Sequence, residues 1–137
     1  MDERQARERF AAARVARLAT VTPEGRPHLV PIVFAVDGDT IYTAVDAKPK
    51  STTALRRLAN ITANPEVAVL ADFYEEDWTR LWWVRADAVA AVVTGGHARA
   101  GIEQLTARYP VYRDQPPPGP VLALDVTRWS GWSAGAA

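Results

Sequence analysis

Short strand-forming segments joined by tight turns dominate the sequence, and this pattern is the strongest constraint on its fold. Residues 28–36 form an almost wholly apolar run, and residues 40–44 follow with β-branched and aromatic side chains. Between them, Asp37-Gly38-Asp39 is typical of a hairpin turn. Because only one helical segment crosses between strands near the middle of the chain, the pattern favours an antiparallel sheet over a doubly wound parallel sheet.

The complete pattern predicts six strands and three helices in a single domain over residues 1–137. The expected strands are residues 17–21, 28–36, 40–44, 67–71, 81–93 and 121–126. Helices are expected to begin at Asp2, at Ser51 or Thr52, and at Gly95-Gly96, because apolar residues at helical spacing follow each of these positions. We therefore expect a mainly β (α+β) fold, with the sheet closed into a barrel and the helices packed at its ends.

The amino-acid composition argues against several classes of function. Sixteen basic residues balance sixteen acidic ones, which argues against nucleic acid as the main partner because phosphate binding needs a basic surplus. The chain has no cysteine, so disulfides, thiol nucleophiles and thiolate metal sites are excluded. Residues 1–4 are charged and predict no signal peptide, and no apolar run approaches the roughly 20 residues of a membrane span. We expect a soluble cytoplasmic domain that binds neither nucleic acid nor membrane.

Residues for classical catalysis are scarce. His28 and His97 are the only imidazoles, and neither stands in a metal-ligand or catalytic-triad spacing. The run Glu75-Glu76-Asp77 is typical of a solvated acidic loop. We therefore name no catalytic residue and no metal ligand, and we expect any reaction to depend on a bound cofactor.

The segment between the third expected strand and the second expected helix is the best candidate for an anion site. Of the sixteen basic residues only two are lysines, and both stand here, as Lys48 and Lys50. Ser51 and Thr52 follow, and Arg56 lies one turn further on. A helix N-terminus adds free backbone N–H groups and partial positive charge, so a phosphate would be held by charge-assisted hydrogen bonds. An ordinary capped helix with solvated lysines is the alternative.

Two apolar features would suit a flat heteroaromatic ring. Pro31 cannot donate to a strand ladder, which places it at a sheet edge or bulge and leaves backbone groups near Val30, Ile32 and Val33 for a ligand. An edge proline that only prevents aggregation is the alternative. All five tryptophans follow residue 77, a density typical of an interface or a planar-ligand site as well as of core packing.

Taken together, these segments resemble the pyridoxamine-phosphate-oxidase-like split β-barrel proteins. The resemblance begins with residues 16–21 (ARLATV), 24–28 (EGRPH) and 30–34 (VPIVF). The deazaflavin-dependent subgroup, the probable coenzyme F420-dependent enzymes of actinobacteria, is indicated by residues 48–50 (KPK), 55–61 (LRRLANI), 64–67 (NPEV), 77–85 (DWTRLWWVR) and 125–132 (DVTRWSGW). The similarity covers nearly the whole chain, and its specificity comes from the order and spacing of these segments.

The resemblance implies a split barrel of the FMN-binding type that works as a homodimer, with cofactor sites at the subunit interface. It implies that the lysine-rich segment binds the cofactor's phosphate and that the ring lies along residues 30–33. The phosphate-binding residues would be Lys48, Lys50, Ser51 and Thr52, with Arg56 as a further candidate, and the ring-binding residues would be Val30, Pro31, Ile32 and Val33. The second subunit would cover the ring with Trp78, Arg80, Trp82 and Trp83, while Arg128 and Trp129 would line the same cleft.

The implied function is that of a coenzyme F420-dependent oxidoreductase, which transfers a hydride between the cofactor and a small, planar, unsaturated organic substrate. Two alternatives stay open. One is an FMN-dependent oxidase or reductase of the same fold, and the other is a non-catalytic carrier or sensor of a flavin, deazaflavin or haem. The residues that recognise pyridoxal phosphate in the true oxidase are not evident in this chain.

Overall fold

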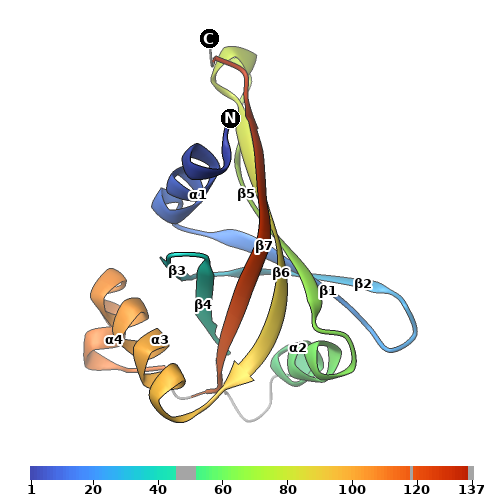
Figure 1. Cartoon of the computed structure of the whole chain (residues 1–137), viewed down its shortest axis with the longest axis vertical. Coiled ribbons are helices and arrows are strands. Elements are labelled where there is room, and N and C mark those ends of the chain that lie inside the picture. The colour runs from blue at the N-terminus through green and yellow to red at the C-terminus, as the bar shows by residue number, and fades with distance from the viewer. Residues whose placement is uncertain (46–51, 118, 136–137) are drawn as a thin grey trace.

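One antiparallel sheet of seven strands organises the molecule (Figure 1), in a computed structural model that describes residues 1–45, 52–117 and 119–135. The strand order is β2-β1-β5-β6-β7-β4-β3. The strands are β1 (Ala16–Val21), β2 (Pro27–Ile32), β3 (Ala35–Asp37), β4 (Thr40–Ala44), β5 (Glu66–Phe73), β6 (Trp82–Val93) and β7 (Val121–Ser133). The helices are α1 (Glu3–Ala12), α2 (Thr52–Ala63), α3 (Gly95–Arg108) and α4 (Val111–Asp114), and η1 (Trp78–Arg80) is a single 3₁₀ turn.

The sheet corrects two of the expectations. Seven strands form instead of six, because the apolar run over residues 28–36 is divided: β2 ends at Ile32 and β3 begins at Ala35. The two parts pair with different neighbours, β2 with β1 and β3 with β4. Since β2 and β3 stand at opposite ends of the strand order, the sheet is not closed into a barrel over the described residues.

Some of the remaining helix and strand boundaries agree with those predicted from the sequence, and others differ. Asp2 caps α1 as expected, and its carboxylate accepts a hydrogen bond from the Gln5 N–H at 2.8 Å. The last strand continues to Ser133 instead of ending at Val126, because β7 pairs with β6 along its whole length. The short helix α4 was not expected at all.

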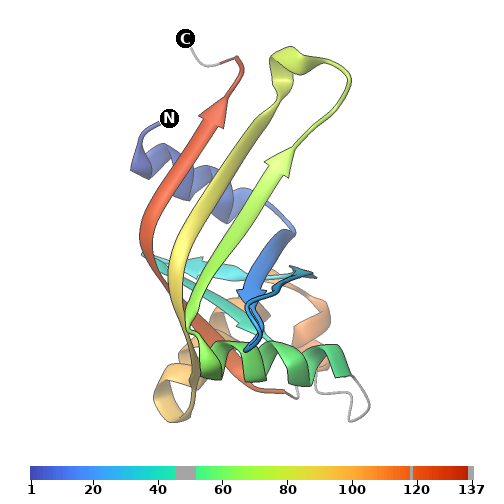
Figure 2. The ribbon, with the colours of Figure 1, turned by 90° about the vertical axis from the view of Figure 1, so that its right-hand side faces the viewer.

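The core lies between the sheet and two helices, α1 beside the upper half of the long strands and α2 across their lower end (Figure 2). Phe10 of α1 is fully buried, with its ring centroid 4.7 Å from that of Phe34 and 5.4 Å from that of Trp129. A smaller apolar cluster under α3 contains Tyr42 and Val121. Over the described residues, no helix is long and apolar enough to cross a bilayer.

Candidate functional site

A cavity of about 340 Å³ forms where β2 ends, and three of the predicted ring-binding residues line it. Pro31, Ile32 and Val33 are joined there by Val15, Thr43, Ala44, Arg57 and Tyr112. As expected for a proline within a strand, Pro31 belongs to an edge strand of the described sheet. Val30 is buried in the core cluster and is not among the cavity-lining residues. Pro31, Ile32 and Val33 therefore form one wall of the cavity, and their role in ring binding stays a prediction.

The wall formed by β2 is tied to β4. The hydroxyl of Thr43 in β4 donates a hydrogen bond at 2.8 Å to the carbonyl of Val33, the residue that directly follows β2. Thr43 is buried, whereas Val33 is exposed. The Val33 carbonyl therefore already takes part in the fold, and Val33 presents its apolar side chain at the surface.

Among the described residues, the positive charge in this cavity comes from Arg57 and not from Arg56. Arg57 is half-buried, and among the described residues its buried Nε has no hydrogen-bond partner. Burial lowers the pKa of Arg57, but a guanidinium stays charged at any physiological pH. A buried N–H without a partner costs free energy, so this position suits an anionic or hydrogen-bond-accepting ligand.

Arg56 lines a different hollow, with a volume of about 720 Å³, between α2 and the β1–β2 turn. Arg56 and Arg57 line different hollows because adjacent residues lie on different faces of a helix. Arg57 shares a face with the buried Ile61, four residues further on, whereas Arg56 lines its hollow together with Ala59 and Asn60. This spacing was the signal in the sequence that could have selected Arg57.

The predicted phosphate-binding segment falls largely outside the described residues. Lys48, Lys50 and Ser51 lie there, and nothing is described of the Thr52 side chain, although Thr52 begins α2. The segment connects β4, whose Ala44 lines the cavity, to the helix that carries Arg57. The role of these residues stays a prediction.

The residues predicted to cover the ring are not among those that line the cavity in this chain. Trp78 is 75% exposed in η1. Arg80 pairs with Glu75 at 3.2 Å, and its guanidinium lies 5.5 Å from the centroid of the Phe73 ring. The Arg9 guanidinium of α1 lies 5.1 Å from the centroid of the Trp82 ring. In this chain, Trp78, Arg80, Trp82 and Trp83 therefore lie outside the lining of the candidate cavity.

Arg128 and Trp129 lie together on β7 but have different environments. Arg128 is exposed, and Asp87 of β6 is opposite it in the ladder. Trp129 is buried in the core and donates its indole N–H to the Asp39 carboxylate at 3.0 Å. Neither residue is among those that line the cavity. Trp129 therefore has a structural role in this chain.

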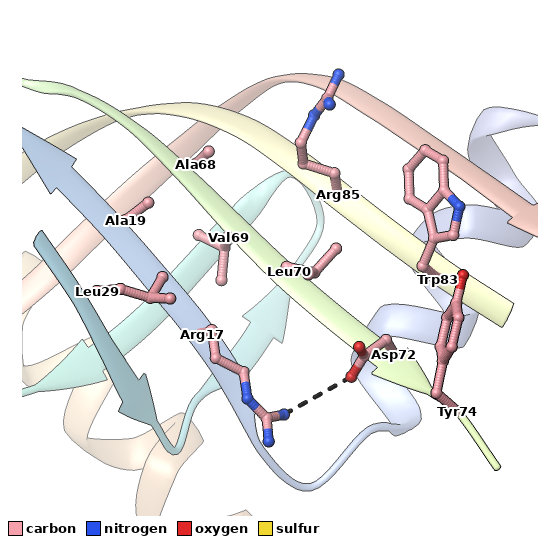
Figure 3. Close-up of a pocket in the computed structure, with 10 residues that line it drawn as sticks. All are labelled: Arg17, Ala19, Leu29, Ala68, Val69, Leu70, Asp72, Tyr74, Trp83 and Arg85. Atoms are coloured by element: carbon pink, nitrogen blue, oxygen red, sulfur yellow. Dashed lines mark ion pairs between the residues drawn. The ribbon is translucent and has the colours of Figure 1, made fainter. Parts of the chain in front are cut away.

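A further hollow of about 670 Å³ lies on the outward face of the sheet (Figure 3). Ala19, Leu29, Leu70 and Trp83 give it an apolar floor, and Leu29 is 66% exposed. An ion pair between Arg17 and Asp72 at 3.8 Å stands at its edge. Sequence analysis did not select this surface, because its residues are spread over four strands.

Among the described residues, no group of three or more His, Asp or Glu side chains could hold a metal ion. His28 stands near the start of β2, opposite Thr20 of β1, and the candidate cavity lies at the other end of the strand. The described residues of the candidate site thus supply apolar groups, hydroxyls and one guanidinium, a set suited to binding and positioning a ligand.

Comparisons with known proteins agree with this architecture. A family model described as pyridoxamine 5'-phosphate oxidase matches residues 2–133. Among solved structures, the fold is similar to that of conserved hypothetical protein Rv2991 from Mycobacterium tuberculosis, at 22% identity over 98% of this chain and 86% of that chain, with a TM-score of 0.78. No curated protein gives a significant match.

Two further solved structures share the fold at low sequence identity. One is the heme storage protein HutZ from Vibrio cholerae, at 20% identity over 97% of this chain and 95% of that chain, with a TM-score of 0.73. The other is a FAD-binding protein from Mesorhizobium loti, at 20% identity over 96% of this chain and 92% of that chain, with a TM-score of 0.74. From the family match and these folds, the chain belongs to the pyridoxamine 5'-phosphate oxidase family and has its split-barrel fold.

Proposed function

We propose that this protein is an oxidoreductase whose cofactor is of the flavin type, with a deazaflavin, coenzyme F420, as its preferred form. The observation that carries the proposal is the half-buried Arg57, whose Nε lacks a partner among the described residues, in an otherwise largely apolar cavity beside Pro31. A ring with a phosphate-bearing side chain needs this combination of a flat apolar wall and a cation.

The residues present fit such a group. Val15, Ile32 and Val33 offer apolar surface to a ring, and Arg57 can donate to phosphate oxygens. The cavity volume of about 340 Å³ is at the lower end of the range for ligand sites, which is roughly 300–1,000 Å³. We propose Lys48, Lys50, Ser51 and Thr52 as the other phosphate-binding residues.

When bound, a deazaflavin supplies the hydride, and the chain supplies position and electrostatics. The apolar wall excludes water from one side of the ring, which strengthens the attraction between Arg57 and an anion. We further propose that the protein is a homodimer in which Trp78, Arg80, Trp82 and Trp83 of the second copy cover the ring, with Arg128 and Trp129 near the same cleft. The substrate would be a small, planar, conjugated acceptor.

Two neighbouring arginines provide a matched test of this proposal. We would titrate the parent, Arg57→Gln and Arg56→Gln with coenzyme F420 and, separately, with FMN, and follow the absorbance and fluorescence of the ring. We expect the parent to bind the deazaflavin more tightly than FMN. Because a hydrogen bond to a charged group is worth about 1.5–3 kcal/mol, Arg57→Gln should weaken binding roughly 10- to 150-fold, and Arg56→Gln should change it little.

Other outcomes would distinguish the alternatives. Tight FMN binding with rapid peroxide formation would favour an oxidase. Binding of haem but of neither ring would favour a carrier and would reject the proposal. If the deazaflavin binds, we expect the reduced form to be stable in air and to be oxidised when a conjugated acceptor is added from a panel of quinones, bilins and enones.

A further inference from the structure

We propose that Arg108 and Tyr109, at the end of α3, are positioning residues that hold the walls of the candidate cavity in their binding geometry. We call this pair the Arg108–Tyr109 clasp. Neither side chain is among those that line the cavity, and the sequence analysis did not select either one. The part of the proposal that concerns ring binding rests on the proposed function, whereas the structural part does not.

The first wall is held through Phe34, which stands in the break between β2 and β3. The Phe34 N–H donates to the Tyr109 hydroxyl oxygen at 3.0 Å. The Phe34 carbonyl accepts from the Arg108 Nη1 and from the Tyr109 hydroxyl, each at 2.8 Å. Both backbone polar groups of Phe34 are thus bound by side chains at the C-terminal end of α3. Val33, the residue before Phe34, lines the cavity.

The second wall is held through the segment between α1 and β1. The Arg108 Nη2 donates to the Ala13 carbonyl. The Arg14 carbonyl lies 3.3 Å from the Tyr109 hydroxyl, a longer alternative to the bond with Phe34. The next residue is Val15, which lines the cavity. The same pair therefore joins Val15 and Val33 to one helix end, although these residues belong to different parts of the chain.

The third wall is Tyr112 of α4, which lies next to α3 (Figure 1). The rings of Tyr109 and Tyr112 meet edge to face, with their centroids 5.9 Å apart at 79°. The Tyr112 N–H also donates to the Tyr109 carbonyl at 3.0 Å. Three cavity-lining residues are therefore either in contact with the clasp, as Tyr112 is, or directly adjacent in the chain to residues that it binds, as Val15 and Val33 are.

This arrangement is a form of preorganisation. A cavity whose walls are already fixed does not have to be ordered when a ligand enters, so the ligand binds more tightly. The Arg108 guanidinium also lies 4.8 Å from the centroid of the buried Phe34 ring, which fixes its direction. Removing one bond of the clasp should let Val15 and Val33 move while the sheet and the core stay folded.

The test uses Tyr109→Phe, which removes the hydroxyl and keeps the ring that packs on Tyr112. We would measure amide hydrogen exchange in the unliganded protein over residues 13–15, 33–35 and 111–114, and the affinity for coenzyme F420 and FMN. We expect faster exchange in the first two segments, with the largest change at the Phe34 amide. For a loss of about one to two neutral hydrogen bonds, we expect ring binding to weaken roughly 5- to 30-fold, with a shifted spectrum of the bound ring.

Tyr42→Phe is the matched control. Tyr42 is buried against the first half of α3, where its ring centroid lies 5.7 Å from that of His97. This variant should leave both readouts unchanged. Arg108→Gln is a second test variant and should act in the same direction as Tyr109→Phe.

Two results would overturn the proposal. One is parent-like exchange around Phe34 in both clasp variants, and the other is faster exchange with parent-like ring affinity. A parent protein that binds neither ring would instead contradict the proposed function. In that case the exchange pattern alone decides whether the clasp holds the walls.

Discussion

The carboxylate of Asp39 joins three parts of the chain at the scale of a single residue. It stands in the turn between β3 and β4 and accepts hydrogen bonds from Arg7 of α1 at 3.1 Å and from the Trp129 indole N–H at 3.0 Å. The bond from Trp129, followed by the bond from Arg7, holds the pKa of Asp39 below its ordinary value. The ionised form of this residue therefore stabilises the folded state.

This lowered pKa predicts a pH dependence of stability. The contribution of Asp39 is fully present above its unfolded pKa, about 3.9 for an aspartate, and is lost as the pH falls through the lower folded value. We expect Asp39→Asn to reduce the thermal midpoint at pH 7 and to flatten its decline below about pH 4. Calorimetric scans of both proteins from neutral to acid pH would measure this. If the thermal midpoints of parent and variant declined in parallel as the pH falls, the stabilising role of ionised Asp39 would be contradicted.

Single residues also show what the sequence could predict about the site. Pro31 was placed correctly at a sheet edge, because the missing N–H is a local property of proline. Arg57 and not the predicted Arg56 lines the cavity, and the sequence analysis did not distinguish them because the difference depends on which face of α2 meets the sheet. The Arg108–Tyr109 clasp has no local signal, because its bonds to Phe34 join residues 74 and 75 positions apart.

At the scale of elements, the presence of a strand was easier to predict from the sequence than its first and last residues. The residue types predicted β4 correctly at both ends, as Thr40–Ala44. The run over residues 28–36 is almost wholly apolar, yet it breaks after Ile32, where Arg108 and Tyr109 at the end of α3 bind the backbone of Phe34. β7 extends beyond the expected end because its partner β6 is long. Boundaries that depend on distant partners could not be derived from local pattern.

The packing of α3 on the sheet depends on a small residue. A Cβ added at Gly101 would lie 2.7 Å from the Tyr42 Cδ1 and 2.9 Å from the Val121 Cγ1, and both of these side chains are buried. We expect Gly101→Ala to destabilise the protein by about 1–3 kcal/mol, less a helix-propensity gain of up to about 1 kcal/mol. Denaturant midpoints would measure the change.

Gly96 in the same helix is the control for this prediction. A Cβ at Gly96 would meet only the Arg99 Nη2, at an ordinary 3.6 Å. Gly96→Ala should therefore raise stability by about 0.4–1 kcal/mol through the lower entropy of the unfolded chain. If the two variants changed stability equally, close packing at Gly101 would not explain the result.

At the scale of the whole molecule, sheet closure was the feature that local pattern could not determine. Hairpins and alternation predict antiparallel neighbours, but whether the outermost strands meet depends on the twist and length of all the others. The outward face formed by β1, β2, β5 and β6 likewise exists only in the assembled sheet, so local pattern could not predict it either. Its apolar floor, with Leu29 at the surface, and its pairs Arg17–Asp72 and Arg85–Asp87 combine both charges with apolar area.

These features fit our proposal that the protein is a homodimer. A two-fold interface places the same patch on both copies, so a patch with both charges can be complementary to itself. We expect light scattering at micromolar concentration to give about twice the chain mass of 15.0 kDa.

The variant Leu29→Glu should give the single-chain mass. Leu29 is exposed in the single chain and contributes little to folding, whereas an unpaired charge opposes burial of this position in an interface. Val111→Glu, at a similarly exposed valine on α4, should remain dimeric. A monomeric parent would reject the dimer, and a dimeric Leu29→Glu variant would place the interface on another face.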